Sequence, residues 1–523
     1  MKVPEHKRRH SALFQAACAL GTVALLLSSY SNAAEWKVLP RLRVLETYSD
    51  NLRMTRNDNG SGDLITQINP GLSVSSVARR FSLDADYTMN NLIYAEASNF
   101  NRIRHQLNAT ATTELIEDLF FVDGRARIRQ QNVSLLGPQS FDNVNVTGNR
   151  ADVRTFSVSP YLRHRFQNFA SAELRYTRSL VTSNANSLFN SSGDSFSGGL
   201  NSGTAFQTLS WGVNYSNQMV HFDRNDRTVE MERTIANLGY RITPQFGLTA
   251  SGGYERNSFI SIRGNPSSPT WTVGFFWNPS ERTSIVANAG QRFFGDTYFV
   301  LANHRTRMTV WDVSYSEDIT TFNQQAQAGA PINLAGSLGQ LLGAQNPTFS
   351  PGLIQENSGA LLGLGASGAF FDPNNFFTNR LFLQKRFQAS VAMNGTRNTL
   401  VFRVFNMTRK AFSPESVDVG IVGAENLALL NHTRQSGANA MWSYRLSNLT
   451  RANVNFGYSR FSFLGHDRED DFMLSSISLT RQFPQILRNL NGMIMVRHNE
   501  RDSNRPGGNY RENAALASLS ISF

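Results

Sequence analysis

The chain has 523 residues with a formal net charge of +11, and 17% of its residues are charged. Beyond the first 33 residues no run of 18 apolar residues occurs, which excludes a transmembrane helix from that part of the chain. The only cysteine, Cys18, lies before this point, so a disulfide framework is excluded as well. The other 490 residues contain no linker and no shift of pattern, which favours one large closed sheet over several domains.

The N-terminus has the three parts of a secretory signal peptide. Basic residues within 2–9 precede an apolar run at 12–27, and the small-residue pattern Ser31-Asn32-Ala33 follows. This run is shorter than the about 20 apolar residues that a retained anchor would need. We therefore expect a signal peptide at 1–33, cleaved there or one residue later, and a mature chain at 34–523. The signal carries four basic residues and one acidic residue, so the mature net charge is +8.

The mature chain alternates apolar and polar residues in segments of about ten residues. At 81–90 the residues Phe, Leu, Ala, Tyr and Met share one side of an extended chain, and Ser, Asp, Asp, Thr and Asn share the other. The same split recurs at 106–115, 154–166 and 246–255. Helical spacing fits none of these segments. One face suits lipid and the other suits water, which also explains a mean hydropathy of −0.32 in a membrane protein.

Turn residues set the rhythm of these strands. Tight turns are predicted at 78–80, 116–118, 167–169, 243–245, 278–280, 394–396 and 447–449, with longer polar loops between them, such as 48–62, 132–149 and 413–431. Short turns face the periplasm and long loops the exterior in outer-membrane barrels. Since lipid offers no hydrogen bonds, such a sheet must close on itself.

Counting strands from 37–47 to the last residue predicts the fold class. It is all-β, a transmembrane antiparallel up-and-down barrel of about 22 strands (18–22), with 195–202 and 297–304 the least clear. At 18 or more strands the interior is too wide for wall side chains to fill, so we expect water, a folded loop or a plug inside.

The chain ends on a strand whose last residue is aromatic. Leu519, Ile521 and Phe523 alternate with serines. This pattern resembles the terminal signal that the barrel-assembly machinery reads, and the alternative is a soluble strand that ends in Phe by chance. Together with the signal peptide it predicts the cell outer membrane as the location.

One insertion, at 318–380, interrupts the rhythm on the outer side. Between 321 and 371 its only charged residue is Glu356, and four leucines have the spacing of a short amphipathic helix: Leu334, Leu338, Leu341 and Leu342. Our hypothesis is that the segment folds into or over the barrel mouth as a constriction or lid. The alternative is an exterior loop that packs on itself or on a partner.

Arginine repeats on the polar faces of two consecutive strands. The residues are Arg125, Arg127 and Arg129 on the first strand, and Arg163 and Arg165 on the next. A basic ladder of this kind inside the lumen would favour anionic solutes. Alternatively, these arginines pair with wall carboxylates such as Asp123, Glu173 and Asp84, and no net bias results.

Motifs of catalysis and metal binding are missing from the sequence. It contains no G-x-S-x-G, H-E-x-x-H or C-x-x-C pattern, and the mature histidines lack ligand spacing. We predict no enzyme, no cofactor and no metal site. A hydrolase site assembled from distant strands stays an alternative.

Three segments carry a family resemblance. They are WKVLPRLRVLETYSDN at 36–51, FFGDTYFVLANHRTRMTVWDVSYSEDIT at 293–320 and TNRLFL at 378–383. They resemble the outer-membrane β-barrel family associated with PEP-CTERM/exosortase systems, over nearly the whole mature chain. The resemblance implies a role beside exopolysaccharide production and export. It implies no site residue, because the motifs are strand and turn residues.

We therefore expect a conduit or scaffold for exopolysaccharide leaving the cell. The alternatives are a general or anion-preferring diffusion porin, and a barrel enzyme or surface-attachment protein. A TonB-dependent receptor would need a folded plug domain before its barrel, and the first strand begins almost at the cleavage site. Expected partners are outer-membrane lipid and lipopolysaccharide, the assembly machinery, and exopolysaccharide with its export components, but not nucleic acid.

Overall fold

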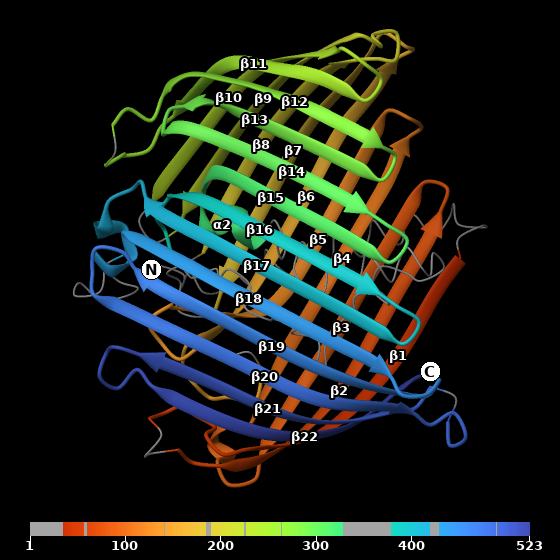
Figure 1. Cartoon of the computed structure of the whole chain (residues 1–523), viewed down its shortest axis with the longest axis vertical. Helices are drawn as coiled ribbons and strands as arrows, with labels where there is room; N and C mark the ends of the chain where they lie inside the picture. The colour runs from red at the N-terminus through yellow and green to blue at the C-terminus, as the bar shows by residue number, and fades with distance from the viewer. Residues whose placement is uncertain are drawn as a thin grey trace, which may run out of the picture.

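The computed structural model describes residues 35–523 except 57–59, 141, 185–189, 224–225, 263, 328–377, 419–427 and 488. Within them, 22 strands form one antiparallel sheet in which chain neighbours pair. The first strand, β1 (Glu35–Ser49), also pairs with the last, β22 (Tyr510–Ser522), and places Arg41 opposite Ser522. The sheet is therefore closed, and the predicted 22-stranded up-and-down barrel is confirmed (Figure 1).

The strands are 10 to 17 residues long. Both of the least clear predictions, 195–202 and 297–304, are strands, β8 and β14. The remaining elements are β2 (Asp63–Ala78), β3 (Phe81–Tyr94), η3 (Ser98–Phe100), β4 (Arg102–Ile116), β5 (Phe120–Asn132), β6 (Arg150–Phe166), β7 (Ala170–Ser183), β8 (Ser191–Ser202), β9 (Leu209–Phe222), β10 (Arg227–Arg241), β11 (Phe246–Asn257), β12 (Ser268–Ser280), β13 (Thr283–Arg292), β14 (Gly295–Arg305), β15 (Thr309–Thr320), α2 (Phe322–Gln327), β16 (Phe382–Asn394), β17 (Asn398–Ala411), η5 (Glu415–Asp418), η7 (Ala428–Leu430), β18 (His432–Arg445), β19 (Thr450–Phe463), β20 (Arg468–Gln482) and β21 (Asn491–Ser503).

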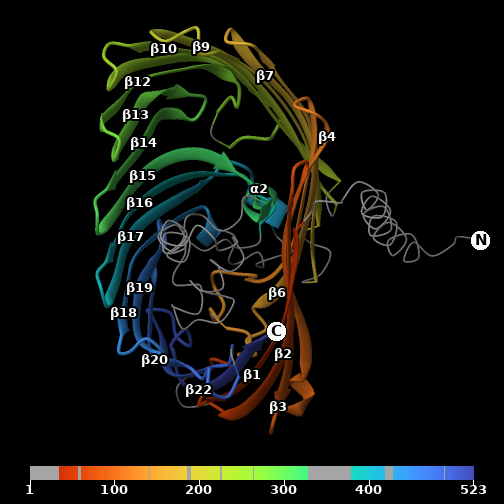
Figure 2. The same cartoon turned by 90° about the vertical axis from the view of Figure 1, so that its right-hand side faces the viewer.

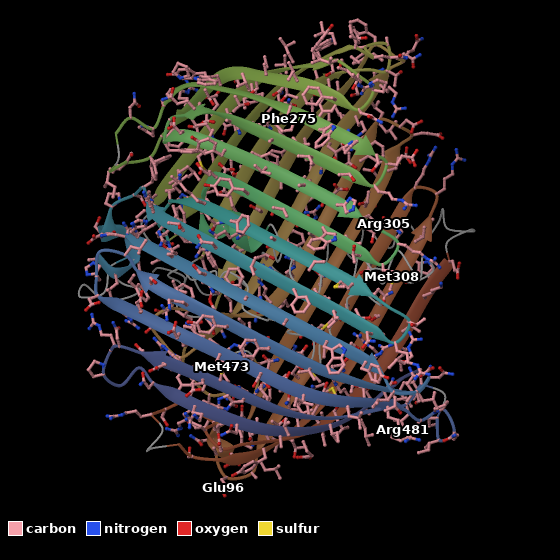
Figure 3. The ribbon with its side chains drawn as sticks, viewed as in Figure 1. Glu96, Phe275, Arg305, Met308, Met473 and Arg481 are labelled. Atoms are coloured by element: carbon pink, nitrogen blue, oxygen red, sulfur yellow. The ribbon has the colours of Figure 1, made fainter. Side chains whose placement is uncertain are left out.

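Short turns gather at one end of the barrel, the short-turn end, and the longest connections lie at the other, the long-loop end. Figure 3 shows Arg305, Met308 and Arg481 along the short-turn end. One predicted turn, 278–280, is wrong: β12 continues to Ser280, with a register shift after Trp277. Pro279 has no N–H for the ladder, and the irregularity lets the strand continue past it.

The outer face of the wall is apolar. Trp271, Val273 and Trp277 of β12 are 44–54% exposed, and Ile477 of β20 is 58% exposed. Their strand neighbours Thr270 and Ser478 are buried toward the lumen side. An outward apolar face around a polar interior is the arrangement of an outer-membrane barrel. Among the described helices, none is both long and apolar enough to cross a membrane.

Candidate functional site: the lumen

The connection from β5 to β6, residues 133–149, is turned into the barrel (Figure 2). Leu135 is buried among phenylalanines of β17, β19 and β20. Val144 is buried among residues of β2 and β3. The prediction that 132–149 is an ordinary exterior loop is therefore wrong. Its apolar side chains find partners inside the barrel, on strands other than β5 and β6.

Buried ion pairs hold this segment against the last two strands. Arg497 of β21 lies 2.6 Å from Asp142 of the segment and 2.9 Å from Glu512 of β22. Asn145 also donates to Glu512, at 2.8 Å. A charge without such partners would be expensive to bury, so the segment and the wall stabilise each other's polar groups.

A second set of contacts holds the backbone of the segment. Arg501 of β21 donates to the carbonyl oxygens of Gly137 and Leu136, at 3.2 and 3.3 Å, and to Asp470 of β20, at 2.9 Å. The Tyr510 hydroxyl donates to the carbonyl oxygen of Gln139 at 3.1 Å. Wall side chains thus take the place of water around buried backbone groups.

Helix α2 follows β15 and lies in the lumen, where its contacts are mainly with β6 to β9. Figure 2 shows it inside the ring of strands. Its Phe322 and Ala326 pack on β6 and β7. Asn323 donates to Ser191 of β8 at 2.8 Å, and Gln324 donates to Gln218 of β9 at 2.6 Å. Arg409 of β17, on another part of the wall, donates to Gln325 at 3.4 Å.

A glycine of β8 makes room for α2. A Cβ on Gly193 would come within 2.6 Å of the Ser179 hydroxyl oxygen and 3.3 Å of the Asn323 Oδ1. A larger residue here would therefore collide first with Ser179 of β7 and would also crowd Asn323 of the helix.

The predicted constriction at 318–380 is described only at its two ends. The first, 321–327, lies in the lumen as α2 and its N-terminal neighbour. At the other end Arg380 is fully buried and donates to the Ser413 carbonyl oxygen at 3.0 Å and to Asn431 at 2.8 Å. Leu334, Leu338, Leu341, Leu342 and Glu356 lie outside the described residues, so their part in a lid stays a prediction.

The arginines of the two predicted rows differ in their described contacts. Arg163 pairs with Glu173 at 2.8 Å, as the pairing alternative expects. Asp123, however, pairs with Arg175 of β7 at 2.7 Å and not with the arginines of its own strand. Arg125 and Arg127 have no ion pair among the described residues, and Arg127 donates to Asn108 at 3.3 Å. These two charges leave the β5 face basic.

The residues that hold segment 133–149 were not predicted from the sequence. Charged residues recur on the lumen face of the last three strands, and this recurrence is a signal that could have pointed to them. These residues are Arg468, Asp470, Arg497, Arg501 and Glu512. Their contact with segment 133–149 could not be predicted, because this segment lies more than 300 residues earlier in the chain.

The C-terminal residues lie at the closing seam. The Phe523 amide donates to the carbonyl oxygen of Pro40 at 2.9 Å. Leu519 and Phe523 are 55% and 67% exposed on the outside. Their recognition by the assembly machinery stays a prediction. Within the described part of the chain, no three His, Cys, Asp or Glu side chains come together as a metal site would require.

Comparison with known proteins gives likeness of fold alone. No family model matches the chain. No curated protein matches it either. Among solved structures, the FrpB iron transporter of Neisseria meningitidis is 12% identical with a TM-score of 0.48, covering 93% of this chain and 82% of its own. The siderophore receptor PirA of Pseudomonas aeruginosa is 11% identical with a TM-score of 0.44, covering 93% and 80%. OccK2 (OpdF) of Pseudomonas aeruginosa is 7% identical with a TM-score of 0.34, covering 94% and 98%.

At such low identities and TM-scores these neighbours carry no argument about function. What the chain itself shows is a closed 22-stranded barrel of the outer-membrane type, with segment 133–149 and α2 folded into its lumen.

Proposed function

We propose that this chain is an outer-membrane conduit for exopolysaccharide, with its short-turn end toward the periplasm. In this proposal segment 133–149 and α2 narrow the lumen at rest. Lipopolysaccharide surrounds the barrel, and the barrel-assembly machinery inserts it. The resemblance to barrels of PEP-CTERM/exosortase systems supports polysaccharide as the cargo.

One observation carries the proposal: the described segments inside the lumen are held by side-chain contacts and are not strands of the wall. A barrel of 22 strands has a lumen too wide for wall side chains to fill. Segment 133–149 and α2 lie outside the strand ladders. They can therefore move aside while every hydrogen bond between strands stays in place. Such an interior suits a long polar polymer that needs an opening only while it passes, because a permanently open lumen of this width would leak solutes.

A deletion strain tests this function directly. Loss of the chain is expected to abolish or strongly reduce secreted polysaccharide, measured as uronic acid and total hexose in the culture medium, while small-solute uptake stays at the wild-type rate. Re-expression of the full chain restores secretion. The reverse pattern, normal polysaccharide with impaired uptake, would identify a diffusion porin instead.

An anion-preferring porin is the second candidate, and Arg125 and Arg127 favour it. Changing both to Gln removes two lumen charges that have no carboxylate partner among the described residues. We expect the reversal potential of the purified protein in a salt gradient to shift toward the value of a cation-selective pore. The reason is that charges that line a pore set its selectivity. Arg256→Gln is the control, because Arg256 pairs with Glu232 on the outer face. Equal potentials for both variants would remove the anion hypothesis.

A further inference from the structure

The lumen wall has a hollow of about 350 Å³ on β7 to β10, lined in part by Glu173, Ser197, Asn201, Asn214, Ser216 and Arg233. Strand register shows that these residues share one face. Arg175, Ser197, Ser216 and Arg233 form one cross-strand row. Glu173, Gly199, Asn214 and Ile235 form the next row. We call this site the β8–β9 hollow.

The charged groups at its two sides are already held in place. Glu173 accepts from Arg163 at 2.8 Å and from Arg175 at 3.1 Å. Arg233 lies 3.0 Å from Glu255, which Arg292 also contacts at 2.7 Å. The hollow therefore offers a fixed acceptor on one side and a fixed donor on the other, so that binding costs little side-chain entropy.

Two glycines let amide side chains lie flat across the floor. A Cβ on Gly199 would stand 3.0 Å from the Asn214 Oδ1, and one on Gly212 would collide with the Asn201 Oδ1. Each asparagine thus lies over the glycine of the neighbouring strand. A side-chain amide offers both a donor and an acceptor, and the serines beside it do the same.

We propose that the β8–β9 hollow is a subsite for a neutral sugar unit of the passing polymer, an inference that rests on the proposed function. A sugar hydroxyl both donates and accepts hydrogen bonds. It therefore matches the amides, hydroxyls, single carboxylate and single guanidinium that line the hollow. A bare anion would meet Glu173, and an apolar ligand would find only Ile235 as an aliphatic partner. The volume lies in the range of small-molecule sites.

The hollow lies between the short-turn end of the barrel and α2. A polymer that enters from the short-turn end therefore reaches the hollow before it reaches the helix. The helix contacts Ser191 and Gln218, toward the long-loop ends of β8 and β9. Asn201 and Asn214 lie toward the other ends of the same strands. The Tyr161 ring, an obvious stacking platform for sugars, is covered by Arg175 at 3.8 Å. Binding should accordingly be weak, which suits transit.

Saturation-transfer NMR on the mature chain, in a detergent without a sugar headgroup, tests the site with maltohexaose. We expect weak binding, with a Kd of about 1 mM. The double variant Asn201→Ala/Asn214→Ala should weaken it about ten-fold, as the loss of two hydrogen bonds implies. Gly199→Leu, which fills the hollow, should do the same if the double variant fails to fold. Asn288→Ala is the control, since this amide of β13 is absent from the lining.

Folding of each variant is checked by the gel mobility shift between boiled and unboiled samples. No maltohexaose binding, unchanged binding in the folded variants, or binding of hexagalacturonate alone would overturn the subsite. These results leave the secretion test of the deletion strain unaffected. Normal secretion in that strain, with maltohexaose binding that the variants abolish, would remove the conduit and keep the sugar site.

Discussion

Replacing residues 134–148 by a short Gly-Ser linker is expected to raise the single-channel conductance of the purified barrel several-fold. The segment occupies the lumen and reaches β2, β3, β17 and β19 to β22. Its removal takes out no strand residue, because Asn132 and Arg150 are the last residue pair of the β5–β6 ladder. Planar-bilayer recording of the mature protein measures the change.

Two further variants complete this experiment. Shortening 504–508, the exposed connection between β21 and β22, is the control and should leave the conductance unchanged. Removing 321–371 takes out α2 and tests the lid predicted from the sequence. If the chain without 134–148 conducts like the wild type, this segment does not narrow the pore, and the gating part of the proposal fails.

Arg501→Met is expected to release segment 133–149 from the wall. Arg501 is 3% exposed and serves both the buried Asp470 carboxylate and two carbonyl oxygens of the segment. Removing one partner of a buried ion pair costs about 3–5 kcal/mol, which is enough to undock a short segment without unfolding the barrel. Limited proteolysis should then cut the chain within 133–149, and mass spectrometry locates the cut.

Arg511→Met is the matched control on the neighbouring strand. Arg511 lies 2.8 Å from Glu500, and its side chain is 54% exposed. Solvent screens such an exposed pair and leaves it little effect on stability, so this variant should resist the protease as the wild type does. Cleavage of both variants to the same extent would show that the segment is not held through Arg501.

The wall of the barrel was predictable because its rules are local. Alternation at 81–90 already separates the two faces of β3, and turn residues such as those at 78–80 mark where strands end. Even the strand at 195–202, whose alternation is unclear, could be predicted. A barrel with both chain termini on the periplasmic side must have an even number of strands. The wrong turn prediction at 278–280 shows where local rules fail. The bulge around Pro279 depends on pairing with the neighbouring strand.

The interior was not predictable in the same way. Segment 133–149 has the polar, turn-rich composition of an exterior loop, and its direction depends on contacts with Tyr510 and Glu512. The row at Arg125 and Arg127 could be predicted from the alternation of a single strand. The partner of Asp123 could not be predicted, because Arg175 is more than 50 residues away and belongs to no repeat on its own strand.

The position of these contacts along the chain also bears on how the protein is made. Arg497, Arg501, Tyr510 and Glu512 belong to the last two strands, so the translated chain contains segment 133–149 long before its partners exist. The full set of contacts of segment 133–149 therefore requires β21 and β22 to be in place. Closure of the sheet between β22 and β1 depends on the same C-terminal hairpin.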